Sequence, residues 1–277
     1  MSPAPKPDRS GGGEWGIGSR PDLCVEPGVE PCVEPCLEPG VWPCLEPLAD
    51  RPSGAPNFDR LAGIYGLMER ASFGPWLGRC RCAFLDDLAA CRRALVLGDG
   101  DGRFTARLLE ANAVVQIDAI DASPAMLRAL LRRAGPHAGR VHAEVADARL
   151  WQPETAQSEA GRGQNPPYDL VVTHFFLDCL TTAEAHSLAA ALRPALAPSA
   201  RWVVSEFAVP EGWFGLLVAR PVVWGLYCAF GWLTGLKVRR LPDHAGALGA
   251  CGFTLEMRRS WLWGLLISEV WRANRSD

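Results

Sequence analysis

Three glycines alternate with two aspartates in the segment LGDGDG, residues 97–102. Gly98, Gly100 and Gly102 follow the apolar run 93–98 and precede a helix-like stretch, 102–112. Glycines let the backbone turn sharply and let a ligand approach it, and the N-terminus of a helix offers N–H groups to a carboxylate or phosphate. The pattern therefore predicts a site for a nucleotide-type cofactor, although a plain strand-to-helix turn uses the same residues.

A carboxylate at the end of the next predicted strand, 113–121, supports the cofactor interpretation. Asp121 follows Gly102 by 19 residues. At the carboxyl end of a neighbouring parallel strand, its side chain can accept hydrogen bonds from both hydroxyls of a ribose. The alternative is an acid that belongs only to the first turn of the next helix.

The residues between the glycines indicate which cofactor it is. A dinucleotide fingerprint has glycines at positions 1, 3 and 6, and position 6 counted from Gly98 is Arg103. Asp99 and Asp101 would lie beside a pyrophosphate, where two like charges ~6 Å apart cost about 3 kcal/mol at an effective dielectric constant near 20. The acids therefore favour a cationic methyl donor over a dinucleotide.

The surrounding elements alternate between strand and helix. Apolar runs predict strands at 93–98, 113–121, 140–147, 168–176 and 200–209, with helices at 102–112, 123–135 and 183–196 between them. Ser123 is the expected N-cap of the second helix, with Pro124 at its first position and Gly135 at its end. Two adjacent strands, 252–261 and 264–273, close the chain. We predict an α/β, Rossmann-like, doubly wound, mostly parallel sheet with a C-terminal antiparallel hairpin.

Five motifs in this order resemble those of the class I S-adenosylmethionine-dependent methyltransferases, over about residues 57–273. They are VLGDGDG at 96–102, IDAIDASPAML at 117–127, AEVADARLW at 143–151, YDLVVTHFFLDCL at 168–180 and LRPALAPSARWVVSEF at 192–207. The resemblance implies a seven-stranded sheet whose last strand is antiparallel, and S-adenosyl-L-methionine as the cofactor. It implies cofactor contacts at the following residues: Gly98, Asp99, Gly100, Gly102, Asp121, Ala122, Asp147, Ala148 and His174. Asp147 would approach the adenine amino group, and Tyr65 resembles a tyrosine of quinone-ring carbon methyltransferases.

One position departs from the family. An acid often stands two residues before the first glycine, where it helps to hold the methionyl amino group, and here that residue is Val96. Asp99 or backbone carbonyls would then have to serve that end of the cofactor.

Three side chains near the predicted strand ends are candidates for the base that removes a proton from a methyl acceptor. They are His174, Asp178 and Glu206. His174 could equally be structural, and Asp178 could instead cap the helix that begins near Thr181. The spacing of His and Cys matches no zinc site, so we expect no metal.

Segment 212–240 is unusually apolar and aromatic. Arg220 and Pro221 interrupt it, which leaves too short a run for a membrane span, and it lies between strands of one sheet. We predict a substrate lid whose aromatic residues, Trp213, Trp224, Tyr227, Phe230 and Trp232, line an apolar pocket or touch a membrane or partner; plain core packing is the alternative. A lid of this kind predicts a small, apolar or aromatic acceptor.

Composition and the N-terminal segment limit the other functions. The 277 residues carry a net charge of −3, which does not favour nucleic-acid binding. Residues 1–56 contain a Pro-rich tetrapeptide repeat and should be a disordered tail, which leaves 57–277 as the folded domain. No apolar signal segment opens the chain, so we expect a cytoplasmic protein with reduced thiols; its oligomeric state is left open.

The sequence thus predicts a small-molecule methyltransferase. The alternatives are a catalytically inactive module that binds S-adenosylmethionine and an NAD(P)-dependent oxidoreductase.

Overall fold

A computed structural model describes residues 73–153, 166–235, 238 and 240–274. All of them belong to the unit Glu46–Asp277, one of two into which the chain divides. The predicted tail, 1–56, and Tyr65 lie outside the described residues.

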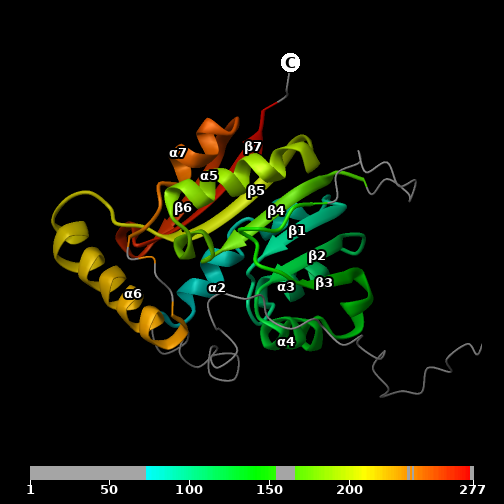
Figure 1. Ribbon diagram of the computed structural model, residues 1–277, viewed down its shortest axis with the longest axis horizontal. Coiled ribbons are helices and arrows are strands. Elements are labelled where there is room, and N and C mark those ends of the chain that lie inside the picture. Colours follow the sequence, from blue (N-terminus) through cyan, green and yellow to red (C-terminus); the bar gives the residue numbers. More distant parts are fainter. Residues whose placement is uncertain (1–72, 154–165, 236–237, 239, 275–277) are drawn as a thin grey trace, which may run out of the picture. The chain divides into compact units, whose positions relative to one another are not determined.

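The described residues form the predicted sheet (Figure 1). Its strands are β1 (Arg93–Leu97), β2 (Gln116–Asp121), β3 (Val141–Val145), β4 (Tyr168–His174), β5 (Leu196–Phe207), β6 (Phe253–Trp261) and β7 (Leu266–Ala273). They lie in the order β3-β2-β1-β4-β5-β7-β6. Strands β1 to β5 pair in parallel, whereas β7 pairs antiparallel with both β5 and β6. The seven-stranded sheet and its terminal hairpin are therefore confirmed.

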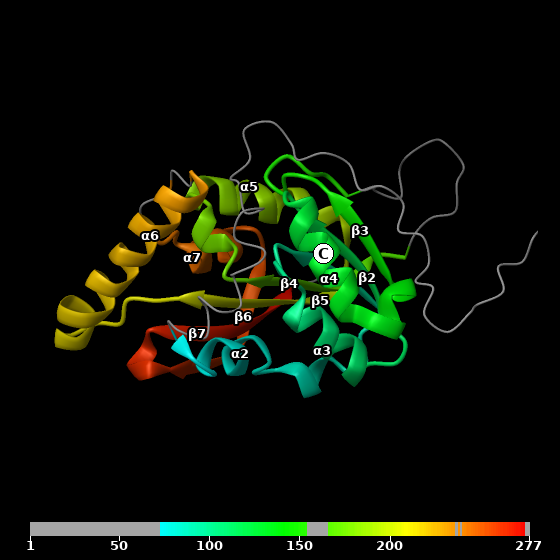
Figure 2. The same ribbon diagram turned by 90° about the horizontal axis from the view of Figure 1, so that it is seen from below.

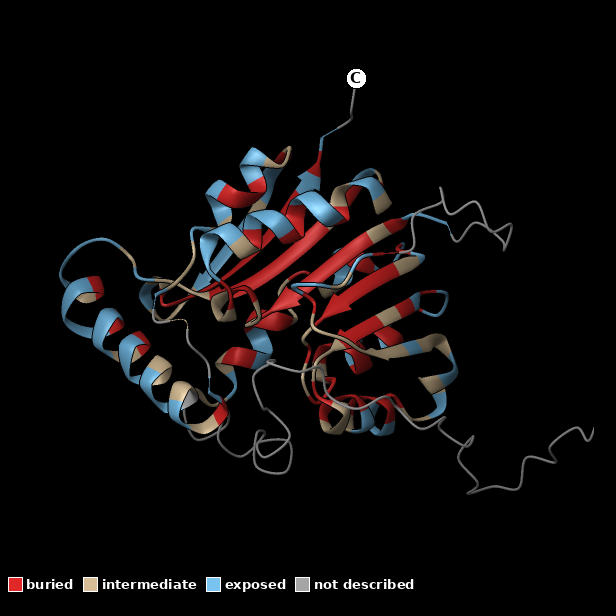
Figure 3. Cartoon of the chain, viewed as in Figure 1, coloured by how far each residue is buried: buried red, intermediate tan, exposed pale blue. Residues whose placement is uncertain are grey.

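Strand alternation divides each central strand between two cores. In β1, Ala94 and Val96 face one apolar cluster, and Leu95 and Leu97 face the other. The first cluster is covered by α3 and α4 and the second by α5 and α7, so helices cover both faces (Figure 2). Figure 3 shows the strands buried along most of their length. This is why the strands read as continuous apolar runs.

The helices follow the predicted pattern closely. They are α2 (Trp76–Arg81), α3 (Arg103–Ala111), α4 (Pro124–Ala134), α5 (Thr182–Leu192), α6 (Arg220–Thr234) and α7 (His244–Ala250), with short 3₁₀ turns η1 (Leu85–Leu88), η2 (Gly135–Arg140), η3 (Leu177–Cys179), η4 (Arg193–Ala195) and η6 (Leu262–Gly264), and a π-helical turn, η5 (Gly215–Ala219). Ser123 caps α4 by accepting from the Met126 N–H, with Pro124 first and Gly135 last, as predicted.

Two boundaries differ from prediction for local reasons. Strand β2 begins at Gln116 rather than at 113, because the Asn112 side chain accepts from the N–H groups of Val114 and Val115 and so shapes the preceding turn. Helix α5 is capped by Thr181, which forms a reciprocal box with Glu184. Asp178 therefore does not cap α5; it lies in η3.

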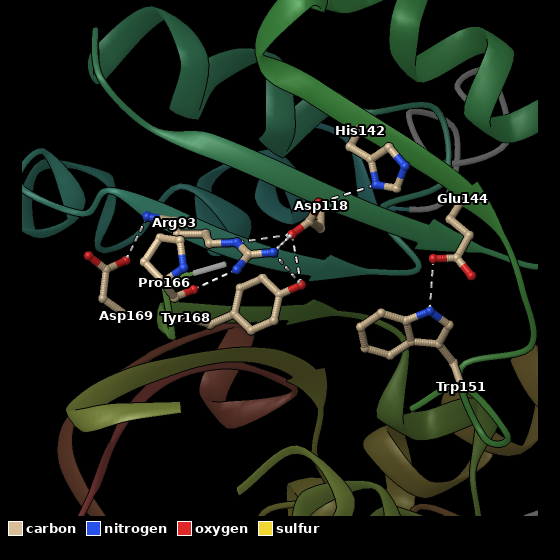
Figure 4. A network of polar contacts seen from close by, with 8 residues as sticks. All are labelled: Arg93, Asp118, His142, Glu144, Trp151, Pro166, Tyr168 and Asp169. Carbon is tan, nitrogen blue, oxygen red and sulfur yellow. Dashed lines mark hydrogen bonds and ion pairs between the residues drawn. The ribbon is translucent and has the colours of Figure 1, made fainter. Parts of the chain in front are cut away.

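A polar network fastens the central strands to one another (Figure 4). Arg93, at the start of β1, contacts the Asp118 carboxylate of β2 at 2.9 Å and lies over the ring of Tyr168, at the start of β4. The Tyr168 hydroxyl donates to the same carboxylate oxygen at 2.7 Å, and His142 of β3 contacts the other oxygen. The network holds four strands in register, which fixes where their carboxyl ends lie.

Candidate functional site

A cavity of about 250 Å³ opens at the carboxyl ends of the central strands. The strand order reverses between β1 and β4, and open α/β sheets bind their ligands outside the strand ends at such a point. Six residues that the sequence suggested for cofactor contact line this cavity together: Gly98, Gly100, Asp121, Ala122, Asp147 and Ala148.

The glycine bend has two different structural tasks. Gly98 has a φ of +65°, and a Cβ there would lie 2.4 Å from the Phe176 ring, so only glycine lets this ring pack against the bend. Gly102 has a φ of +77°, and its Cβ would lie 2.6 Å from the Leu130 Cα. Gly102 does not line the cavity; it permits α3 to approach α4, which corrects its predicted role in cofactor contact.

The two acids of the bend do not face the cavity either. Asp99 accepts from the Thr105 N–H at 2.8 Å and from the Thr105 hydroxyl at 2.7 Å, and burial raises the pKa of its carboxyl. Asp101 forms ion pairs with Arg103 and with Arg133, the latter at 2.6 Å. The predicted repulsion between these acids and a pyrophosphate is therefore wrong, because Asp101 is paired and Asp99 points into the start of α3.

The same contacts still disfavour an anionic ligand, for another reason. The Asp99 carboxylate already occupies the first turn of α3, where a phosphate bound at a helix N-terminus would sit. It takes the Thr105 N–H that such a ligand would use.

Two carboxylates mark the cofactor half of the cavity, at the ends of β2 and β3. Asp121 lines the cavity, with one oxygen held at 2.8 Å by the Ser123 N–H. Asp147 also lines it, and the Arg149 side chain, which donates at 2.9 Å, lowers the pKa of the Asp147 carboxyl. Fixed acceptors beside apolar walls, such as Ile120 and Met126, fit the ribose and adenine of S-adenosylmethionine.

The other half of the cavity is apolar and aromatic. Its walls come from α2, from the ends of β4 and β5, and from α6; they include Phe73, Leu77, Phe175, Phe207, Val223 and Leu233. Asp178 lies among them, and the loss of water around its carboxyl raises its pKa to about 6. Tyr227 of α6 also lines the cavity, and its hydroxyl donates to the Asp178 backbone carbonyl at 2.9 Å.

Glu206 supports this half without lining the cavity. Its Oε1 accepts from the N–H groups of Phe176 and Leu177, at 3.2 and 2.8 Å. Burial, followed by the nearby charge of Asp178, raises the pKa of Glu206 well above its ordinary value. Glu206 therefore stays protonated and holds the turn that carries Asp178, so the structure does not support it as a base.

His174 is also placed away from the cavity lining. It is buried at the end of β4 with its ring 4.4 Å from that of Phe104, and among the described residues neither ring nitrogen has a hydrogen-bond partner. Burial, then the charge of Arg81, lowers the pKa of His174 well below its ordinary value. The predicted roles of His174 in catalysis and cofactor contact are not supported by this position.

The sequence reading missed Arg81. Its side chain is 5% exposed, lines the cavity and lies over the Phe175 ring at 5.2 Å. A buried cation in this position fits the carboxylate of the methionyl end. The available signal was its place one helical turn after Leu77, on the buried face of α2.

The aromatic residues of the predicted lid divide between two sides of the helix. Tyr227 lines the cavity as predicted, whereas Trp213, Trp224 and Trp232 are 72%, 66% and 86% exposed. The prediction that these tryptophans line the pocket is wrong; their part of the helix faces outward.

Comparisons with known proteins agree with this architecture. Residues 95–202 match the family described as methyltransferase domain. No curated protein matches the chain. Among solved structures, mitomycin 7-O-methyltransferase is 16% identical with a TM-score of 0.56, over 78% of this chain and 60% of its own length.

Two further structures show the same fold. An O-methyltransferase family protein from Burkholderia thailandensis is 15% identical with a TM-score of 0.55, over 80% of this chain and 65% of its own. Human N-acetylserotonin methyltransferase, solved in complex with SAM, is 15% identical with a TM-score of 0.53, over 79% of this chain and 58% of its own. The chain thus spans less than two thirds of each of these proteins.

Proposed function

The chain carries a methyltransferase domain with the class I fold, and from that premise we propose that it transfers a methyl group from S-adenosylmethionine to a small apolar or aromatic acceptor. The observation that carries the proposal is the two-part cavity. One part has acids at the ends of β2 and β3, and the other has aromatic walls around Asp178.

The residues of the first part would hold the cofactor. Asp121 accepts hydrogen bonds from the ribose hydroxyls, Asp147 approaches the adenine amino group, and the backbone at Gly98 and Gly100 forms the floor. Arg81 pairs with the methionyl carboxylate. When bound, S-adenosylmethionine supplies a methyl group made electrophilic by a sulfonium.

The residues of the second part act on the acceptor. The apolar rings exclude water and bind an apolar or aromatic body. Asp178 is ionised at neutral pH, because its pKa is about 6, and it accepts the proton of an acceptor hydroxyl. Two of the similar structures are named as O-methyltransferases, which supports a hydroxyl as the methylated group.

Val96 favours a second candidate, a module that binds the cofactor without turnover. It is 1% exposed in the core of β1, at the position where the family often has an acid, and no carboxylate can act from there.

Calorimetry on the full chain tests the proposed cofactor. We expect S-adenosylmethionine to bind and NAD not to bind. Asp121→Ala removes a hydrogen-bonding carboxylate worth roughly 1.5–3 kcal/mol and should weaken binding about ten- to hundredfold. The matched control Glu110→Ala changes an exposed acid of α3 and should leave the affinity unchanged. Binding of NAD alone would refute the proposal, and unchanged affinity in Asp121→Ala would remove the ribose assignment.

Turnover separates the two candidates. The protein is incubated with S-adenosylmethionine and a panel of phenolic and quinol acceptors, and S-adenosylhomocysteine is measured. Product formation that Asp178→Asn abolishes supports the methyltransferase; cofactor binding without product on any acceptor favours the inactive module.

A further inference from the structure

Helix α6, with the π-helical turn η5 before it, has one side that the sheet does not cover. The two form a continuous helix, Gly215–Thr234, at the edge of the domain (Figures 1 and 2). Ala219 and Val223 pack against Leu265 on its inner side. Its outer side is exposed, as Figure 3 shows for most of its length.

The exposed side carries large apolar residues. We define the tryptophan face as Trp213, Leu216, Leu217, Trp224, Trp232 and, from the β6–β7 turn, Trp263, all of which are between 58% and 86% exposed. Trp263 joins the helix through Phe214, whose ring lies 5.4 Å from its own. An apolar surface of this kind on a folded chain marks a place of contact with a partner or a membrane.

The burial of the helix distinguishes it from a core helix and its topology from a membrane span. It is long and apolar enough to cross a bilayer, yet only 18% of its most apolar window is buried. Strand β5 precedes it and β6 follows it in the same sheet, so a single crossing would place two paired regions of one sheet on opposite sides. A helix that lies along a surface satisfies both observations.

The charge of the segment identifies the surface. Between residues 212 and 242 the sequence has four basic residues, Arg220, Lys237, Arg239 and Arg240, and no Asp or Glu, although the whole chain has a net charge of −3. Basic residues beside an apolar helix attract the anionic headgroups of a bilayer, and tryptophan favours the boundary between headgroups and acyl chains.

We propose that the tryptophan face lies on an anionic lipid bilayer, with α6 parallel to the membrane plane. The inner side of the same helix lines the cavity with Val223, Leu226, Tyr227 and Leu233. Docking would therefore bring the apolar half of the cavity beside the bilayer. In the part that rests on the proposed function, the acceptor is a membrane-dissolved, lipid-like molecule.

Vesicle co-sedimentation tests the docking. The full chain is mixed with phosphatidylcholine vesicles with and without phosphatidylglycerol. We expect sedimentation with the anionic vesicles and a blue shift of tryptophan emission. The triple variant Trp213→Gln, Trp224→Gln, Trp232→Gln should lower partitioning by roughly tenfold or more, because its indoles no longer enter the interface. The control Val114→Gln, Leu255→Gln changes exposed apolar residues elsewhere and should bind like the parent.

A charge pair tests the electrostatic part. Arg220→Glu should lower partitioning on anionic vesicles by roughly tenfold, whereas Arg107→Glu, an equally large charge change on the exposed side of α3, should have little effect.

Two results would overturn the proposal. One is sedimentation that the triple variant leaves unchanged. The other is a parent protein that ignores vesicles but elutes as a dimer, which the triple variant converts to a monomer; the face would then be covered by a second copy. Calorimetry with S-adenosylmethionine on the same variants separates these failures from failure of the proposed function, because none of the substituted residues lines the cavity.

Discussion

Replacing Asp178 by asparagine should stabilise the protein at neutral pH while it removes the proposed base. Burial among the cavity's apolar walls raises the pKa of this carboxyl from 3.8 to about 6. The folded state therefore binds the proton more tightly than the unfolded state does. Its contribution to stability is fully present below 3.8 and is lost as pH rises through about 6. Each pH unit between the two values corresponds to about 1.4 kcal/mol, so the ionised carboxylate costs about 3 kcal/mol above pH ~7.

Asparagine keeps the shape and an acceptor oxygen for the Cys179 thiol, but it does not ionise. The variant should therefore be more stable than the parent by up to about 3 kcal/mol above pH ~7, and the advantage should vanish below pH ~4. Urea unfolding of both proteins at a series of pH values measures the difference. The control Asp86→Asn changes an exposed carboxylate of η1 and should show no pH-dependent difference. A difference that is constant from low to neutral pH would refute the desolvation argument and, with it, the reason for assigning Asp178 as the base.

Two further predictions concern the bend and the N-terminal segment. Gly98→Ala places a Cβ 2.4 Å from the Phe176 ring at a φ of +65°, so it should lower the free energy of unfolding by about 1–3 kcal/mol and weaken S-adenosylmethionine binding; Gly249→Ala, where a Cβ meets nothing within 4 Å, should not, and equal effects in thermal melts and calorimetry would contradict the steric argument. Deletion of residues 1–56 should leave the melting temperature and cofactor affinity unchanged, and a loss of either would show that this segment belongs to the folded domain.

The sheet and its helices could be predicted because their signals are local. Apolar runs of strand length, the Ser123-Pro124 helix start and Gly135 at its end are each read within a few residues. The positions of Asp121 and Asp147 at the cavity follow from the same signals, since both come directly after a parallel strand and parallel strands end at one edge.

The side-chain directions at the site could not be predicted, because they depend on residues far along the chain. Asp101 turns away from the cavity since Arg133, 32 residues later, pairs with it. Glu206 stays protonated because the N–H groups it meets belong to a turn 30 residues earlier. The outward direction of Trp224 depends on which side of α6 packs against Leu265, and both sides of that helix are apolar in the sequence.

The two-sided character of α6 has a consequence for regulation. One rigid element forms a wall of the cavity through Tyr227 and Leu233 and meets the exterior through Trp224 and Trp232. By linkage, any shift of this element on attachment to a lipid surface that tightens acceptor binding must also make the acceptor-loaded enzyme attach more tightly, by the same factor. The protein would then gather where its substrate is plentiful and detach as the substrate is consumed, without a separate regulatory domain.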